Sequence, residues 1–177
     1  MSGVDETLHR SKEEMRLIAR ILTVIPRFTG YKEKELRRES DKLIRDHLYR
    51  RLREAKDSLK EVSQKLSDHR LYGVLEDIDR LVMKFDRVNA RIDHASYGYS
   101  GFFNIIKIQE KGLEEMLSFD SNLIEAEEKL FEDVKALKGI EVKEIKKIRR
   151  HLDTIRSTLK RLEETFNERK EKILGVR

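Results

Sequence analysis

Residues 145–166 read IKKIRRHLDTIRSTLKRLEETF, and the spacing of their apolar side chains decides the fold class. These side chains recur at alternating steps of three and four residues, at Ile145, Ile148, Leu152, Ile155, Leu159, Leu162 and Phe166. Such steps place all of them on one face of an α-helix, whereas a half-buried strand alternates at every second residue. The stretch therefore predicts an amphipathic helix whose apolar stripe, here called the seam, packs in the manner of a coiled coil.

Similar helical spacing recurs in three earlier stretches of the chain. The first runs from Leu8 to Ile25, the second from Ile44 to Leu66 and the third from Val74 to Ala95. A less regular stretch over residues 104–138 keeps a period of seven. Because chance does not repeat this pattern so often in one chain, the sequence predicts a protein built from helices.

Residues that break helices divide these stretches. Pro26 lacks a backbone N–H and pushes the residue before it out of helical geometry, so residues 25–31 are predicted to form a loop. Gly73 and Gly139 are predicted to end or kink the helices that precede them. The turn-like stretch 96–101 contains two glycines and separates the third helix from the fourth.

The chain is thus predicted to form about five helices in one domain that covers residues 1–177. Their expected ranges are 4–24, 32–69, 73–95, 104–138 and 141–174. The second of these would be roughly 57 Å long at 1.5 Å per residue, and such a rod must pack against rods of similar length. The predicted fold class is therefore all-α, an elongated antiparallel helical bundle with coiled-coil-type packing.

Two acids interrupt the seam of the stretch 104–138. Asp120 and Glu127 stand at positions where the period of Met116, Leu123 and Leu130 would place further apolar side chains. We expect adjacent apolar pairs to form the buried stripe, which leaves both acids at its margin. The alternative is a buried polar layer, in which Arg or Lys from another helix pairs with the acids and fixes the register.

Composition excludes several classes of protein. The 177 residues include one Pro, eight Gly and no Cys, which excludes disulfides and thiolate chemistry and disfavours an all-β fold with many tight turns. No apolar run is long enough for a transmembrane helix, and the acidic N-terminus lacks the features of a secretory signal, so we expect a cytoplasmic location. Abundant Lys, Arg and Glu with few Gln and Asn are typical of heat-adapted proteins.

Charge is distributed unevenly along the chain. Residues 27–60 hold twelve basic and seven acidic side chains, residues 108–141 hold four and ten, and residues 142–177 hold twelve and six. An acidic segment between two basic ones favours packing guided by charge, inside the bundle or between two copies. The basic clusters also allow nonspecific nucleic-acid binding. Acids interleave every cluster, however, which favours solvated helix faces laced with ion pairs.

The sequence offers no constellation typical of catalysis or metal binding. Only Glu6 and His9 have the Glu-x-x-His spacing of a di-iron bundle, and one such pair is too few. A phosphate-binding glycine loop and a nucleophile elbow are both missing. We therefore predict no enzyme activity, no catalytic, cofactor-binding or metal-binding residues, no cofactor and no small-molecule substrate.

Two segments are more distinctive than an ordinary coiled-coil sequence. One runs from Ile25 through Gly30 and Tyr31 to Glu35 and continues as Arg37-Arg38-x-x-Asp41-x-x-x-Arg45. The other runs from Arg91 to Phe103, includes Tyr97-Gly98-Tyr99-Ser100-Gly101-Phe102-Phe103, and leads to Leu113, Leu117 and Phe119-Asp120. Together they resemble an uncharacterised family of helical bacterial and archaeal proteins that has a Pro/Gly/Tyr element leading to Arg-Arg and a later Tyr-Gly-Tyr-x-Gly-x-Phe element. The resemblance covers part of the chain and implies a helical fold but no activity.

The aromatic side chains of these two segments admit two interpretations. In the first, they plug the end of the bundle at the turn between the third and fourth helices. In the second, they form an exposed patch for a partner or a membrane interface, with Arg37, Arg38 and Asp41 at its rim. The candidate interaction surface consists of Phe28, Tyr31, Arg37, Arg38, Tyr97, Tyr99, Phe102 and Phe103.

These observations favour a non-enzymatic interaction or scaffold protein that binds a protein partner or associates with itself. A peripheral membrane-associated coiled-coil protein is the alternative, because Pro26 separates an amphipathic N-terminal helix from long hairpin-forming helices. Against this alternative, the N-terminal helix carries Glu13 and Glu14 and has no net charge, a poor match to anionic lipid. Nonspecific nucleic-acid binding through the basic helix faces is the third hypothesis.

Overall fold

The computed structural model describes residues 2–95 and 110–174 of the chain. These residues form five α-helices and no strand, so the predicted all-α fold class is confirmed. The helices are α1 (Ser2–Leu22), α2 (Lys34–Asp68), α3 (Tyr72–His94), α5 (Glu110–Lys138) and α6 (Ile145–Leu174).

The helix boundaries follow the breakers in the sequence, with two exceptions. The predicted ranges 4–24, 32–69, 73–95, 104–138 and 141–174 correspond in order to the observed helices. The predicted start at 141 is wrong, because residues 139–144 form the turn between α5 and α6. Within this turn the N–H of Glu144 donates to the carbonyl of Glu141 at 2.9 Å. The predicted start at 104 lies outside the described residues.

The turn between α2 and α3 also differs from the prediction. Gly73 does not end α2 but lies in the first turn of α3. Instead, Arg70 takes the left-handed conformation with φ 58°. Its N–H donates to the carbonyl of Ser67 at 2.8 Å, and the N–H of Leu71 donates to that of Leu66 at 3.0 Å. This pair of hydrogen bonds is the Schellman cap, here built on an arginine where glycine is the usual residue.

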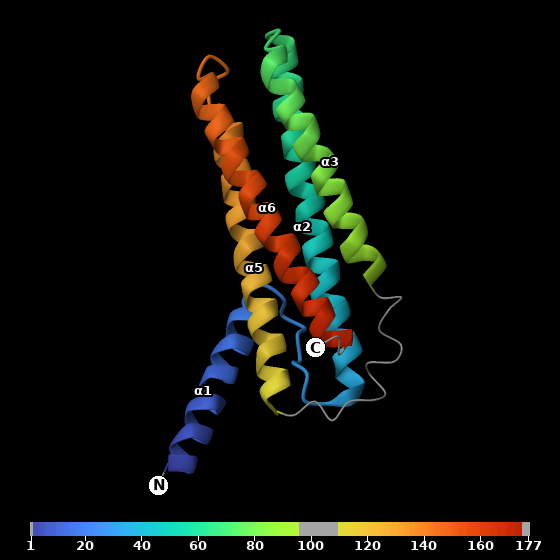
Figure 1. Ribbon diagram of the computed structural model, residues 1–177, viewed down its shortest axis with the longest axis vertical. Coiled ribbons are helices and arrows are strands. Elements are labelled where there is room, and N and C mark those ends of the chain that lie inside the picture. Colours follow the sequence, from blue (N-terminus) through green and yellow to red (C-terminus); the bar gives the residue numbers. More distant parts are fainter. Residues whose placement is uncertain (1, 96–109, 175–177) are drawn as a thin grey trace.

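The bundle consists of two antiparallel hairpins, α2 with α3 and α5 with α6 (Figure 1). The hairpins pack face to face, because α2 contacts α5 and α3 contacts α6. Both chain reversals, at residues 69–71 and 139–144, lie at the same end of the molecule (Figure 1). Helices α2 and α5 therefore run in the same direction. Antiparallel packing holds within each hairpin, while the interface between hairpins is parallel.

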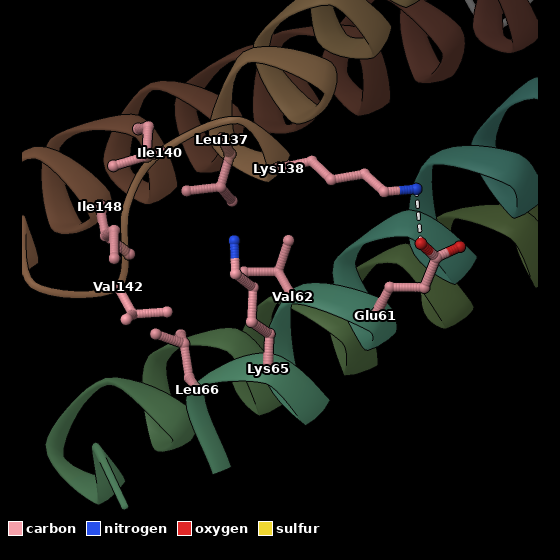
Figure 2. A pocket seen from close by; sticks show the side chains of 9 residues that line it. All are labelled: Glu61, Val62, Lys65, Leu66, Leu137, Lys138, Ile140, Val142 and Ile148. Atoms are coloured by element: carbon pink, nitrogen blue, oxygen red, sulfur yellow. Dashed lines mark ion pairs between the residues drawn. The ribbon is translucent and has the colours of Figure 1, made fainter. Parts of the chain in front are cut away.

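The two hairpins leave a partly open cavity of about 200 Å³ between them near their turns (Figure 2). Apolar side chains from α2, α5, the turn and α6 face one another across this space, which we call the hairpin cavity. They are Val62, Leu66, Leu137, Ile140, Val142 and Ile148. The α2–α3 and α5–α6 hairpins are thus packed less completely at this end than along the centre of the bundle.

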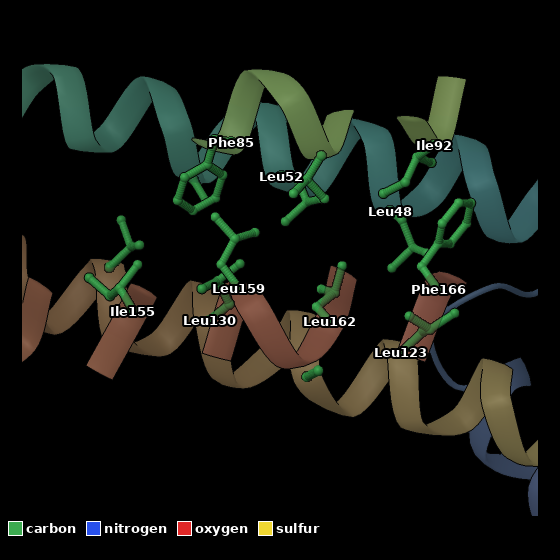
Figure 3. Close-up of a cluster of buried hydrophobic side chains, with 14 of the residues drawn as sticks. Leu48, Leu52, Phe85, Ile92, Leu123, Leu130, Ile155, Leu159, Leu162 and Phe166 are labelled. Atoms are coloured by element: carbon green, nitrogen blue, oxygen red, sulfur yellow. The ribbon is translucent and has the colours of Figure 1, made fainter. Parts of the chain in front are cut away.

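The predicted seams form the core along the centre. Leu52, Phe85, Leu130 and Leu159 come from the four bundle helices and face one another (Figure 3). Along α6, every predicted seam residue from Ile148 to Phe166 is at most 2% exposed. Burial of each such side chain contributes about 1.5–3 kcal/mol to folding. The apolar seams of the four bundle helices are therefore buried within one chain. The predicted seam of the first stretch is buried only in part, because Met15 and Leu22 are exposed.

Helix α1 stands apart from the four-helix arrangement. It packs against α5 through its last turns, where Ile21 is fully buried and Leu17 and Ile18 are partly buried against the core. Its earlier part extends beyond the bundle, and the N-terminus lies far from the hairpins (Figure 1). We call α1 residues 2–16 the arm.

Replacing Leu59 or Leu152 with Ala tests the seam assignment. Both side chains are at most 1% exposed, so each change is expected to lower the free energy of unfolding by about 2–5 kcal/mol. Urea unfolding followed by circular dichroism measures this loss. Met83→Ala on α3, whose side chain is 57% exposed, is the control and should change stability by less than about 0.5 kcal/mol. Losses below about 1 kcal/mol at both leucines would contradict the assignment.

Candidate functional site

The largest fully buried side chain in the described residues is charged: Arg169 of α6 is 0% exposed. Its guanidinium donates hydrogen bonds to three other segments of the chain. Nε donates to Asp120 Oδ1 of α5 at 2.6 Å, and Nη1 donates to Asp41 Oδ1 of α2 at 2.8 Å. Nη2 donates to the hydroxyl of Tyr31, in the loop between α1 and α2, at 2.9 Å. One cation therefore joins both hairpins and the loop that leads to α1.

Two further hydrogen bonds complete this arrangement. Arg45 Nε donates to Asp41 Oδ2 at 2.8 Å, and the hydroxyl of Tyr31 donates to Asp120 Oδ2. We call these five residues, Tyr31, Asp41, Arg45, Asp120 and Arg169, the arginine cluster. Two arginines face two aspartates, so the formal charges cancel. Charge balance and these hydrogen bonds offset the penalty of removing the ions from water.

The loop that carries Tyr31 is held against the bundle by its own hydrogen bonds. Ser40 Oγ donates to the carbonyl of Gly30 at 2.7 Å, and Arg37 Nε donates to the carbonyl of Tyr31 at 2.7 Å. Gly30 has φ 79°, a conformation that glycine adopts without strain. The rings of Phe28 and Tyr31 meet edge to face, with centroids 5.6 Å apart. The loop thus presents the Tyr31 hydroxyl to the cluster in a fixed position.

Burial governs protonation within the cluster. Desolvation raises the pKa of Tyr31 well above its usual value of 10.0, and the negative charge of Asp120 adds to the increase. Burial also raises the pKa of Asp120, although the charge of Arg169 and the hydrogen bonds from Tyr31 and Arg169 act in the opposite direction. Tyr31 is therefore a neutral hydrogen-bond donor to Asp120 at neutral pH.

A second polar layer lies two helical turns further along α5. Glu127 is 2% exposed and accepts a hydrogen bond from Arg51 Nε at 2.8 Å. His47 Nε2 lies 3.1 Å from the other carboxylate oxygen, while His47 Nδ1 is buried without a partner in the described structure. The guanidinium of Arg51 also stacks on the ring of Phe131 at 3.7 Å from its centroid. We call Glu127, His47 and Arg51 the glutamate layer.

The position of the two acids corrects the sequence-based expectation. Asp120 and Glu127 do not lie at the margin of the stripe, since they are 0% and 2% exposed. The alternative of a buried polar layer is confirmed, with basic residues from other helices as partners. Arg169 pairs with Asp120, and Arg51 with Glu127. These partners make burial of the acids possible, because an unpaired carboxylate inside the bundle would be strongly destabilising.

Sequence reasoning missed Arg169 and placed Asp41 at the rim of an exposed patch, although a signal for the burial of both existed. The seam of α6 continues beyond Phe166 by steps of three and four, first to Arg169 and then to the buried Ile173. The seam of α2, extended backwards from Ile44 by three, reaches Asp41. Asp120 holds the matching position on α5. Charged residues at seam positions on three helices therefore mark one common layer.

The structure describes four of the eight residues predicted to form the candidate interaction surface. Phe28 and Tyr31 are 3% and 4% exposed, so the interpretation of these two rings as an exposed patch is wrong. They pack inside because the loop folds onto the bundle. Arg37 is half-buried and binds loop carbonyls, and Arg38 is exposed. The remaining members, Tyr97, Tyr99, Phe102 and Phe103, lie outside the described residues.

Several other kinds of site were sought in the residues that the structure describes. No group of three or more His, Asp or Glu side chains is arranged to hold a metal ion there. No helix in these ranges combines the length and apolarity needed to cross a membrane. In the arginine cluster, Asp120 and Arg169 have no exposed surface, so the cluster joins segments of the chain in the protein interior.

Comparison of the chain with protein-family models, with curated proteins and with solved structures finds no match. The resemblance to an uncharacterised helical family therefore stays a prediction.

Replacing Arg169 with Met tests the role of the arginine cluster. The change keeps an unbranched apolar stem but leaves Asp41 and Asp120 in the interior without their shared cation. We expect the free energy of unfolding to fall by about 3–5 kcal/mol, as measured by urea unfolding. Adding Asp120→Asn should recover part of the loss, because one uncompensated charge disappears. Arg161→Met, at an exposed position on the same helix, is the control. If Arg169→Met and Arg161→Met lowered the free energy of unfolding by the same small amount, this role of the cluster would be contradicted.

The raised pKa of Tyr31 predicts a pH dependence of stability. Above about pH 10, Tyr31 loses its proton in the unfolded chain but keeps it in the folded one. Below about pH 10, Tyr31 is protonated in both states and its full contribution to the free energy of unfolding is present. At higher pH the free energy of unfolding should fall by up to about 1.4 kcal/mol per pH unit. Unfolding by urea at a series of alkaline pH values measures the slope.

Tyr31→Phe should remove this part of the slope, whereas Tyr49→Phe on α2, outside the cluster, should retain it. If wild type and Tyr31→Phe had the same alkaline slope, Tyr31 would titrate in the folded state as it does in water, contrary to the raised pKa.

Proposed function

We propose that the protein is a non-enzymatic interaction or scaffold protein, in which a rigid bundle presents the arm to a protein partner. One observation supports this above all: α1 packs on α5 through its last turns, and the arm extends beyond the bundle (Figure 1). Short isolated helices are marginal in water, so a projecting helix gains stability when a second surface covers it.

The apolar residues of α1 support the same proposal. Met15 is 60% exposed and Leu22 is 37% exposed, and they lie seven residues apart on one side of the helix. An amphipathic helix that docks into a groove of a partner uses anchors at such spacing. Met is also common at adaptable binding surfaces, because its side chain is flexible and polarisable.

The arginine cluster supplies the rigidity that such a role needs. Tyr31 and Gly30 are held by hydrogen bonds to side chains of α2, α5 and α6, so the loop that follows α1 is fixed on the bundle. Binding energy is then not lost in ordering the base of the arm. The buried charges serve this positioning and have no exposed surface at Asp120 and Arg169 for a substrate.

Self-association, if it occurs, would use the arm and not the seams. The seam residues predicted to join two copies are buried inside one chain, as shown by Leu59 and Leu159 at 0% exposure. A partner surface must therefore be sought among exposed residues, and among the described side chains of α1 Met15 is a large apolar one that is 60% exposed.

A peripheral membrane role is the second candidate, favoured by the same projecting amphipathic helix. Glu13 and Glu14 on the arm weaken attraction to anionic lipid, which places this candidate lower. Nonspecific nucleic-acid binding ranks third, because acids on neighbouring helices pair with basic side chains of the bundle. Lys56 with Asp86 is one such pair between α2 and α3.

The proposal predicts that Met15→Glu weakens association. The added charge opposes burial of the arm against an apolar partner, so the association constant should fall at least about tenfold. Light scattering coupled to size-exclusion chromatography at increasing concentration measures self-association. Affinity capture from cell extract, comparing wild type with the variant, measures binding to another protein.

Met83→Glu is the matched control, because Met83 on α3 is similarly exposed at 57% but lies on the bundle. Association that survives Met15→Glu, or that Met83→Glu weakens equally, would overturn the role of the arm. Flotation of the chain with anionic vesicles, lost in Met15→Glu, would instead favour the membrane candidate.

A further inference from the structure

The hairpin cavity is large enough to hold an apolar group. Its volume is about 200 Å³, and it is open to solvent on one side. A closed apolar cavity of about 150 Å³ in another protein binds benzene, so this space suffices for a group of that size. Three of its apolar lining residues belong to the core of the helices, since Leu66 and Leu137 are each 1% exposed and Ile148 is 2% exposed. Ile140 and the partly buried Val142 come from the turn between α5 and α6. Water in such a space would have few polar partners, so an apolar occupant is favoured over solvent.

One exposed charged group stands at the rim of this apolar space. Lys65 lines the cavity and is exposed, and its ammonium group lies near Val62 and Leu137 (Figure 2). The two other charged residues that line the cavity, Glu61 and Lys138, form an ion pair with each other. Among the residues that the structure describes, no acid pairs with Lys65. The lining therefore carries one excess positive charge beside an apolar surface.

This combination matches an amphipathic anion. The apolar body of such a ligand would lie against Leu66, Leu137 and Ile148, and its negative end would meet the Lys65 ammonium. A lysine side chain is a single flexible point charge, so it balances one negative charge. A monoanionic carboxylate therefore fits this lining better than a dianionic phosphate.

We propose that the hairpin cavity binds a small free carboxylic acid with an apolar chain or ring. The acid lies between the α2–α3 and α5–α6 hairpins, and Lys65 holds its carboxylate at the rim. This site is at the opposite end of the bundle from the arginine cluster, and it is independent of the role proposed for the arm.

Binding at this place would affect how the hairpins are held together. The cavity is lined by both α2 and α5, so a ligand in it contacts both hairpins at once. A ligand that binds only the folded chain raises its stability in proportion to the logarithm of ligand concentration. The melting temperature should therefore rise with the concentration of the acid.

The test uses three eight-carbon probes that differ only in charge: octanoate, 1-octanol and octylammonium. Titration of the full-length, isotope-labelled chain followed by NMR gives both the affinity and the residues that respond. Octanoate is expected to bind most tightly and to shift the amide signals of Leu66, Leu137 and Ile148. Octanol should bind more weakly, and octylammonium weakest of all.

Lys65→Gln should weaken octanoate binding about tenfold and leave octanol binding unchanged, because only the charge-assisted contact is lost. Lys60→Gln is the matched control, since Lys60 is exposed on the same helix and does not line the cavity. Val142→Trp fills the cavity from the turn and should abolish binding of both octanoate and octanol.

The proposal is overturned if octanoate does not bind, or if Lys65→Gln and Lys60→Gln weaken it equally. Equal affinity for octanoate and octylammonium would overturn it as well. Signal shifts that begin only where octanoate forms micelles would mean surface adsorption, which also contradicts a site for the free acid. If Val142→Trp fails to fold by circular dichroism, the comparison of Lys65→Gln with Lys60→Gln decides.

Discussion

The buried guanidinium of Arg169 is the interaction on which the arrangement of this bundle depends. It contacts α2, α5 and the loop after α1 from its own position on α6. Removing several ions from water costs several kcal/mol for each, and only the complete set of partners compensates this penalty. A shift of any one helix along the bundle would leave a charge unpaired inside the protein. The cluster therefore selects one register among those that apolar seams alone would allow.

The two ends of the bundle differ for the same reason. At the end where α2 and α5 begin, the arginine cluster and the glutamate layer bind the hairpins to each other through directional hydrogen bonds. At the end with the turns, the hairpin cavity lies between apolar side chains, and the ion pair of Glu61 with Lys138 joins α2 to α5 beside it. Polar layers specify position, whereas apolar surfaces supply most of the stabilisation. The proposed ligand site lies where apolar side chains dominate the contact between the hairpins.

The loop after α1 links this architecture to the proposed function. Pro26 and Gly30 end one helix and turn the chain, and Tyr31 ties the turn to the cluster. The direction in which α1 leaves the bundle consequently depends on the same buried charges that fix the hairpin register. A mutation of the cluster would therefore affect the direction of the arm as well as stability, which connects the buried polar layer to the proposed partner binding.

The sequence by itself determined the helices and their buried faces, because helical periodicity is a local property that each stretch carries alone. The seam from Ile148 to Phe166 and the loop at Pro26 could be predicted for this reason. Local spacing also showed that Asp120 and Glu127 interrupt a seam, but it left open whether they are buried. That outcome depends on Arg169 and Arg51, which lie 49 and 76 residues away in the chain. Only the tertiary structure decides which distant cation meets which acid, that α2 and α5 run parallel, and that Phe28 and Tyr31 fold inside, since each follows from how whole helices pack.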